Sequence, residues 1–207
     1  MKRLVVLISG TGTNLHALLQ ACREPHYGAQ VVAVGADREC DGLNLARNAG
    51  IPTFIAPLEE FPTRGAWDQE LTRQTDQFKP DLVISAGFLK LVGDHFLTTF
   101  HGKFINTHNS LLPAFPGTKG PKDALDYGVK ITGATLFLVD QGLDTGVIIS
   151  QVAVPVKEDD TVETLTERIK DAERNQLVES VGAMVRNGWR VSGRRFSFGG
   201  VGESTKS

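Results

Sequence analysis

The sequence predicts an α/β fold, a doubly wound and mostly parallel twisted sheet with helices on both faces and an antiparallel addition in the C-terminal half. Short apolar runs alternate with amphipathic stretches through the first half of the chain, which favours right-handed strand–helix–strand crossovers. A glycine-rich turn follows the first apolar run. In the second half, two longer apolar runs are joined by a short loop, and a short connection favours antiparallel pairing.

The first half of the chain is expected to supply the parallel strands, at residues 4–8, 31–34, 53–55, 81–85 and 103–106. The first of these runs is continuously apolar, as in a strand that is buried on both faces. Apolar residues at helical spacing predict helices between the strands, at residues 13–22, 43–49 and 67–78. Gly50 is expected to close the second of these helices at its C′ position.

The second half is expected to extend the same sheet. Residues 131–139 and 147–156 are its predicted strands, and the short loop between them indicates that they pair with each other. One continuous sheet is therefore predicted through an N-terminal half, residues 1–101, and a C-terminal half, residues 102–207, of a single domain.

A long helix is predicted after the last of these strands. Asp160 and Glu163 have the spacing of a capping box, and Asn187-Gly188 is expected to stop the helix. The Gly- and Ser-rich tail from Ser192 onward is expected to be partly mobile.

Composition excludes several classes of protein. The 207 residues can bury enough apolar surface to fold without a disulfide or a metal staple. Lys plus Arg number 22 and Asp plus Glu number 24, and a net charge of -2 does not favour a nucleic-acid partner. Cys22 and Cys40 fit neither a zinc motif nor a disulfide framework, which favours a reducing cytoplasm, and the histidines show no metal-ligand spacing. The apolar runs are too short to cross a bilayer, so no membrane partner is expected.

Residues 9–14, Ser-Gly-Thr-Gly-Thr-Asn, connect the first predicted strand to the first predicted helix. Glycines allow a sharp turn with exposed N–H groups, and the helix N-terminus adds partial positive charge, so a phosphate fits there. Leu15 takes the place of the third glycine of a dinucleotide fingerprint, and the loop lacks the lysine of a P-loop. The loop therefore favours a phosphomonoester over NAD or ATP, with a tight turn capped by Thr13 or Asn14 as the alternative. Asp37, after the second strand, is interpreted as a turn residue rather than as a ribose ligand.

A second candidate site lies at the end of the fifth predicted strand, where Asn106 and His108 are two residues apart and so share a face. Open α/β sheets place their ligands at the carboxyl ends of strands. An amide donor beside an imidazole is suited to stabilise the oxygen charge that develops when a carbonyl is attacked. Asp140 and Asp144 follow in a later loop, and a carboxylate near His108 would favour the imidazolium. Taken singly, His108 would be interpreted as a structural histidine and Asp144 as a turn former.

Five stretches in order cover nearly the whole chain: Leu-Ile-Ser-Gly-Thr-Gly-Thr-Asn (7–14), Asp-Leu-Val-Ile-Ser-Ala-Gly-Phe-Leu-Lys-Leu-Val (81–92), Asn-Thr-His-Asn-Ser-Leu-Leu-Pro-Ala-Phe-Pro-Gly (106–117), Asp-Gln-Gly-Leu-Asp-Thr-Gly (140–146) and Arg-Ile-Lys-Asp-Ala-Glu (168–173). Together they resemble the folate-dependent phosphoribosylglycinamide formyltransferases of purine biosynthesis. The resemblance implies a Rossmann-like formyltransferase domain that transfers the formyl group of 10-formyltetrahydrofolate to the amine of glycinamide ribonucleotide. The spacing of the histidines predicts no metal, the cytoplasm is the expected compartment, and the oligomeric state is left open between a monomer and a homodimer.

The resemblance also implies roles for individual residues. Backbone N–H groups of Gly12, Thr13 and Asn14 would hold the 5′-phosphate, with Lys170 reaching the phosphate and Glu173 the ribose. Without the resemblance, Lys170 and Glu173 would be an ordinary solvated pair at i, i+3 on one helix face. Asn106 and protonated His108 would stabilise the tetrahedral oxyanion, and Asp144 would support His108 and position a water that moves the proton between nitrogens. The folate would contact Arg64, a pterin-lining segment of Leu89, Lys90, Leu91 and Val92, Asn106, and a covering loop of Asp140, Gln141, Gly142, Leu143 and Asp144.

The chain departs from the usual family pattern at Asn109, where proline is usual, at Lys90, where arginine is common, and at Lys119, to which no role is given. The remaining alternatives are related or unrelated functions. A formyltetrahydrofolate hydrolase would be expected to carry an N-terminal regulatory domain, for which the start of the first strand leaves no room. A methionyl-tRNA formyltransferase would add a C-terminal domain and a basic surface. A passive nucleotide-binding module does not account for the Asn106 and His108 pair, and a dinucleotide oxidoreductase does not fit Leu15.

Overall fold

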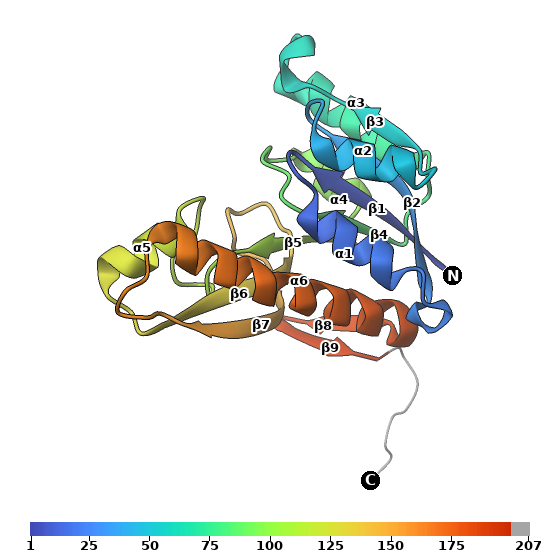
Figure 1. The fold of residues 1–207 in the computed structure, drawn as a ribbon. Helices are drawn as coiled ribbons and strands as arrows, with labels where there is room; N and C mark the ends of the chain where they lie inside the picture. The colour runs from blue at the N-terminus through green and yellow to red at the C-terminus, as the bar shows by residue number, and fades with distance from the viewer. Residues whose placement is uncertain (200–207) are drawn as a thin grey trace.

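The computed structural model describes residues 1–199 and contains one seven-stranded sheet of order β3-β2-β1-β4-β5-β6-β7 (Figure 1). The strands β1 to β5 pair in parallel, and β6 and β7 join the sheet antiparallel. This confirms the predicted fold class and the continuity of the sheet through both halves of the chain. The strands are β1 (Lys2–Ile8), β2 (Ala29–Ala36), β3 (Thr53–Ile55), β4 (Leu82–Ser85), β5 (Phe104–His108), β6 (Ile131–Leu138) and β7 (Ile148–Pro155).

Helices cover both faces of the sheet, because successive residues of each buried strand point to opposite sides. On one face, alternate residues of β1 such as Leu4 and Val6 pack against α1, α2 and α6, which Figure 1 shows with α1 and α6 lying side by side. On the other face, Val5 and Leu7 pack against α3 and α4. The helices are α1 (Thr13–Ala21), α2 (Asp41–Asn48), α3 (Arg64–Asp76), α4 (Asp94–Thr99), α5 (Gly120–Tyr127) and α6 (Val162–Asn187), with short 3-10 turns η1 (Pro25–Tyr27) and η2 (Leu58–Glu60).

The strand order reverses between β1 and β4, which lie side by side at the centre of the sheet. Ligands of open α/β sheets bind at such a reversal, outside the carboxyl ends of the strands. The loops that leave β1, β4 and β5 all emerge at this edge, because these strands run parallel. The fold therefore brings the glycine loop, the segment before α4 and the end of β5 to one place.

One expectation about the second half was wrong. The capping box of α6 is formed by Thr161 and Thr164, one residue beyond the predicted pair, while Asp160 accepts hydrogen bonds from the Arg168 guanidinium. After α6, β8 (Trp189–Ser192) and β9 (Arg195–Phe198) form a two-stranded hairpin, and the expected partial mobility of the tail stays a prediction. In residues 1–199, none of the helices combines the length and the apolar character that a membrane span requires.

Candidate active site

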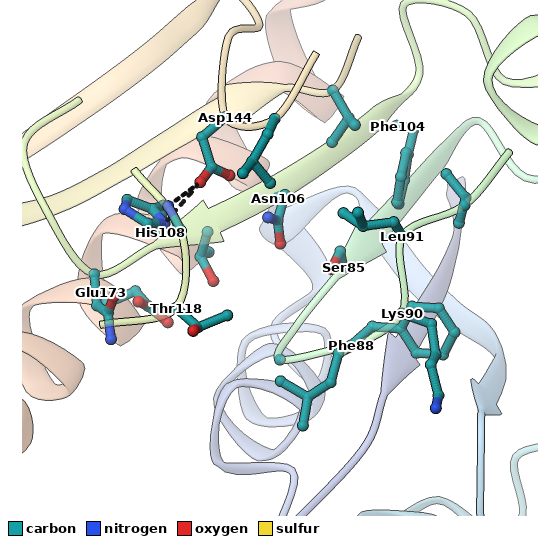
Figure 2. A pocket seen from close by; sticks show the side chains of 18 of the residues that line it. Ser85, Phe88, Lys90, Leu91, Phe104, Asn106, His108, Thr118, Asp144 and Glu173 are labelled. Atoms are coloured by element: carbon teal, nitrogen blue, oxygen red, sulfur yellow. Dashed lines mark hydrogen bonds and ion pairs between the residues drawn. The ribbon is translucent and has the colours of Figure 1, made fainter. Parts of the chain in front are cut away.

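A cavity of about 420 Å³ opens at the carboxyl edge of the sheet, beside the point where the strand order reverses (Figure 2). The strands β4 and β5, the loops that follow them, the loop after β6 and one face of α6 line it. The lining residues that the sequence had singled out are Leu89, Lys90, Leu91, Val92, Asn106, His108, Leu143, Asp144, Lys170 and Glu173. Segments that are far apart in the chain therefore contribute to one cleft.

His108 is fixed at the end of β5 by contacts to both ring nitrogens. Its Nε2 lies 2.9 Å from the carbonyl oxygen of Phe115, and its Nδ1 lies 3.7 Å from Oδ2 of Asp144. A carbonyl can only accept, so Nε2 is the donor in its contact with Phe115. The side chains of His108 and Asp144 are 6% and 10% exposed, so water screens their interaction only weakly. Figure 2 shows this pair at one wall of the cavity.

Asp144 is held in place by the conformation of its loop. Its φ of 54° lies in the left-handed region, and its Oδ2 accepts a hydrogen bond of 2.7 Å from the backbone N–H of Gly117. Two residues further on, a Cβ at Gly146 would lie 1.6 Å from the carbonyl oxygen of Leu138, so only glycine lets the loop pass β6 so closely. The backbone conformation of the loop therefore positions the Asp144 carboxylate beside His108.

Asn106 lies on the same face of β5 as His108, as the two-residue period predicts. Its side chain lines the cavity and is labelled beside Ser85 in Figure 2. Asn106 and His108 both pair with residues of β6, so the antiparallel strand fixes the backbone that carries them. An amide and an imidazole thus face one space, which is the arrangement that stabilises charge on an attacked carbonyl.

The glycine loop and α6 meet through a buried pair. Nδ2 of Asn14 donates a hydrogen bond of 2.6 Å to Oε1 of Glu173, so Asn14 does not cap its own helix as the alternative interpretation required. Burial raises the pKa of the Glu173 carboxyl above its ordinary value, although the Asn14 hydrogen bond opposes the shift. Gly12 adopts a φ of 75°, and a Cβ there would lie 2.8 Å from Cα of Gly42. Lys170, one helical turn from Glu173, also lines the cavity and pairs with Glu167 at 2.9 Å.

The segment 88–92 lies across the cavity from α6. The N–H of Leu89 donates to Oγ of Ser9 at 2.9 Å, and the Arg64 guanidinium donates to the carbonyl of Leu91. Nζ of Lys90 is 3.9 Å from the carboxylate of Asp37, which is 1% exposed and also binds Arg38 at 2.7 Å. Asp37 is therefore an anchor for charged side chains as well as the turn residue that the sequence indicated.

The covering loop is divided between two cavities. Leu143 and Asp144 line the cavity that contains His108, whereas Asp140, Gln141 and Gly142 line a neighbouring one of about 560 Å³ bounded by α4 and β8. Oδ1 of Asp140 is used inside the loop, where it accepts from the N–H of Gly142 and the hydroxyl of Thr145. The structure thus does not bring these three residues to the cavity with the others.

Sequence reasoning missed several residues that build the site. Ser85, Phe88, Phe104, Thr107 and Thr118 line the cavity. The available signal was that Ser85 and Phe88 lie at or just after the end of β4 and that Phe104 and Thr107 lie on β5, whereas Thr118 in the later loop gave no such signal. The carbonyl of Phe115 could not have been found, because the backbone carries no residue-specific signal. Within residues 1–199, no group of three or more His, Cys, Asp and Glu side chains is placed to hold a metal ion.

Comparison with known proteins agrees with this geometry. The family model described as formyl transferase matches residues 2–181. Phosphoribosylglycinamide formyltransferase of Mycobacterium tuberculosis is 52% identical over 197 residues, which cover 95% of this chain and 91% of that protein. The human trifunctional purine biosynthetic protein adenosine-3 is 42% identical over 172 residues, 83% of this chain and 17% of that protein. The crystal structure of glycinamide ribonucleotide transformylase 1 from Symbiobacterium toebii matches with a TM-score of 0.93 at 41% identity, over 97% of this chain and 95% of that chain. The chain therefore belongs to the formyl transferase family and, within it, to the phosphoribosylglycinamide formyltransferases.

Proposed function

We propose that the chain transfers the formyl group of 10-formyltetrahydrofolate to the primary amine of glycinamide ribonucleotide, in the cavity around Asn106, His108 and Asp144. The products are formylglycinamide ribonucleotide and tetrahydrofolate. The observation that carries the proposal is the convergence of these three side chains, from β5 and from a loop more than thirty residues later, on one cleft. The same cleft is lined by Lys170 and Glu173 of α6, and Glu173 accepts a hydrogen bond from Asn14 of the neighbouring glycine loop, which supports a meeting of ribonucleotide and folate there.

The reaction is proposed to proceed by direct attack. The amine nitrogen of the ribonucleotide forms a bond to the formyl carbon, and the carbonyl electron pair moves onto oxygen. Asn106 donates a hydrogen bond to that oxygen, and His108 offers the proton on Nδ1, since its Nε2 is held by Phe115. The carboxylate of Asp144, 3.7 Å from Nδ1, would stabilise positive charge on the ring in the transition state. The bond from carbon to N10 of the folate then breaks, while a water positioned near Asp144 carries a proton from the attacking nitrogen to N10.

The ribonucleotide is proposed to lie between the glycine loop and α6. Backbone N–H groups of Gly12, Thr13 and Asn14 at the start of α1 would hold its phosphate. Lys170 would exchange its exposed partner Glu167 for the phosphate, because a surface ion pair of this kind contributes little to stability. Glu173, which accepts a hydrogen bond from Asn14, would accept another from a ribose hydroxyl.

The folate is proposed to lie against residues 89–92, with main-chain groups of this segment as its polar partners. An apolar slot with few polar anchors suits a pterin. Arg64 would approach the folate from the start of α3, beside its present partner Leu91. Leu143 and Asp144 would close over the pterin, and the rest of the covering loop, Asp140, Gln141 and Gly142, would support them from the neighbouring cavity.

The two halves of the chain are proposed to divide the work. Residues 1–101 supply the phosphate loop, and residues 102–207 supply the catalytic side chains and the covering loop. Each half also contributes to the other binding site: Glu173 of the second half would contact the ribonucleotide, and Arg64 of the first half would contact the folate. The cytoplasm is the proposed compartment, in keeping with the free thiols of Cys22 and Cys40. The functional unit is proposed to be a monomer or a homodimer.

An absorbance assay tests the proposal. The protein is incubated with a 10-formyl folate analogue, with and without glycinamide ribonucleotide, and deformylation is followed over time. Release that depends on the ribonucleotide supports the transferase. Release without it would instead indicate a formyltetrahydrofolate hydrolase, and absence of release from folded protein would indicate a binding module.

A further inference from the structure

The segment that precedes α4 enters the active cavity with little packing of its own. Residues 88–92 form neither helix nor strand, and Leu89 and Leu91 are 71% and 64% exposed. The Phe88 ring is buried and stacks on Trp67 of α3, with ring centroids 6.4 Å apart. A segment with two exposed leucines requires polar anchors to keep one conformation, since few buried apolar contacts hold it.

Asp68 of α3 supplies an anchor at the end of this segment. It is 4% exposed, and its carboxylate accepts hydrogen bonds from the backbone N–H groups of Gly93 at 2.6 Å, His95 at 3.1 Å and Phe96 at 3.2 Å. Gly93 is the N-cap residue of α4 and has no side chain with which to accept from the first turn. Asp68 therefore caps α4 from a different helix, through hydrogen bonds that the carboxylate charge strengthens.

The contact leaves no space for a side chain at position 93. A Cβ on Gly93 would lie 2.7 Å from both Cγ and Oδ2 of Asp68. The φ of Gly93 is -100°, which any residue adopts, so the close approach of Asp68 is the reason for glycine here. One helical turn earlier, Arg64 donates to the carbonyl of Leu91. The first turns of α3 thus hold the segment at Leu91 and again at Gly93.

From this geometry we infer that Asp68 is a positioning residue for the formyl folate. It fixes Gly93, and through Gly93 it sets the path of residues 89–92 along the cavity. The inference rests on the proposed folate role of that segment. The hydrogen bonds of Asp68 go to the segment and to α4, whereas the ribonucleotide is proposed to lie at α1 and α6. Loss of the anchor is therefore expected to weaken folate binding selectively.

Two variants disturb the anchor in different ways. Asp68→Asn keeps the shape of the side chain but turns one acceptor oxygen into an NH₂ group that faces N–H donors. Gly93→Ala keeps the carboxylate and pushes the segment away from it. The matched controls on α3 are Asp76→Asn, at an exposed position, and Gly65→Ala, where a Cβ meets nothing closer than Oγ1 of Thr63 at 3.9 Å.

The KM values for a 10-formyl folate and for glycinamide ribonucleotide are measured separately. Both anchor variants are expected to raise the folate KM about 10- to 100-fold, as for loss of a hydrogen bond to a charged group, and to leave the ribonucleotide KM within about twofold. The controls are expected to match the parent enzyme. In a Trp189→Phe background Trp67 is the single tryptophan, and its emission is expected to change in both anchor variants because Phe88 moves off its ring.

An unchanged folate KM in either folded variant overturns the inference. Equal rises in both KM values, or failure of both variants to fold, also overturn it, because Asp68 would then serve only general stability. If one variant fails to fold, the other decides. If the parent enzyme shows no ribonucleotide-dependent deformylation, the proposed function fails instead, and a folate-binding titration of the same variants still tests the anchor.

Discussion

The charge of Asp144 can be removed without changing the shape of its side chain. In Asp144→Asn, the amide oxygen still accepts from the N–H of Gly117, which now donates to the carboxylate at 2.7 Å. The left-handed backbone at position 144 suits asparagine as well as aspartate. The substitution therefore keeps the loop and deletes the negative charge beside His108.

The distance of 3.7 Å between Nδ1 of His108 and Oδ2 of Asp144 sets the size of the effect. Two unit charges at that distance attract by about 4.5 kcal/mol at an effective dielectric constant of about 20 and by about 1.1 kcal/mol in bulk water. Both side chains are at most 10% exposed, which places the pair nearer the first figure. Loss of this attraction is expected to lower kcat/KM by about 10- to 1,000-fold, since each 1.4 kcal/mol is a factor of about ten.

Steady-state rates of ribonucleotide-dependent deformylation measure this loss, and the thermal midpoint of each variant shows whether the fold is kept. Asp126→Asn is the control, because Asp126 is 61% exposed and pairs only with Lys122 on the surface of α5 within the described residues. A folded Asp144→Asn enzyme within about threefold of the parent rate would refute an electrostatic role for Asp144.

Four further substitutions test the rest of the site and the N-cap of α6. Asn106→Ala and His108→Ala are each expected to keep the fold and to reduce kcat by roughly 10²–10³, as for loss of one oxyanion donor, and a near-normal rate in either would contradict the assignment. Glu173→Gln is expected to gain stability over the parent as the pH rises above the ordinary pKa of glutamate. The pKa of Glu173 is higher in the folded protein than in the unfolded one. Its contribution to the free energy of unfolding is therefore fully present below the unfolded pKa and is lost as the pH rises through the folded pKa. Thermal midpoints at pH 5 and pH 8 check the sign. Thr161→Ala removes the N-cap of α6 and is expected to cost about 1 kcal/mol in denaturant titrations with no change in kcat.

Strands and long helices could be predicted from the sequence because their signals are local. The buried strand β1 is continuously apolar, and the apolar period of α6 extends over many turns. Asn106 and His108 could be predicted for the same reason, since two residues of separation on a strand determine a shared face. The helices α4 and α5 were missed, and the six residues of α4 carry too little periodicity to be recognised.

Contacts between distant segments could not be predicted from local patterns. Asp68 lies inside a helical stretch, and nothing in that stretch shows that its carboxylate receives N–H groups from residues 93–96. Asp160 has the spacing of a capping residue, yet Arg168 binds its carboxylate at 2.6 Å, and Thr161 takes the cap. In both cases the tertiary partner decides what an acidic side chain does.

The catalytic geometry depends on two loops that hold each other. The hydroxyl of Ser110 donates to the carbonyls of Ala114 and Phe115, which shapes the loop after β5. In that loop, the carbonyl of Phe115 contacts Nε2 of His108, and the N–H of Gly117 donates to Asp144. A displacement of either loop would therefore break the orientation of the imidazole and the position of the carboxylate together. The charge pair consequently acts as a unit, and substitutions in it are expected to be non-additive.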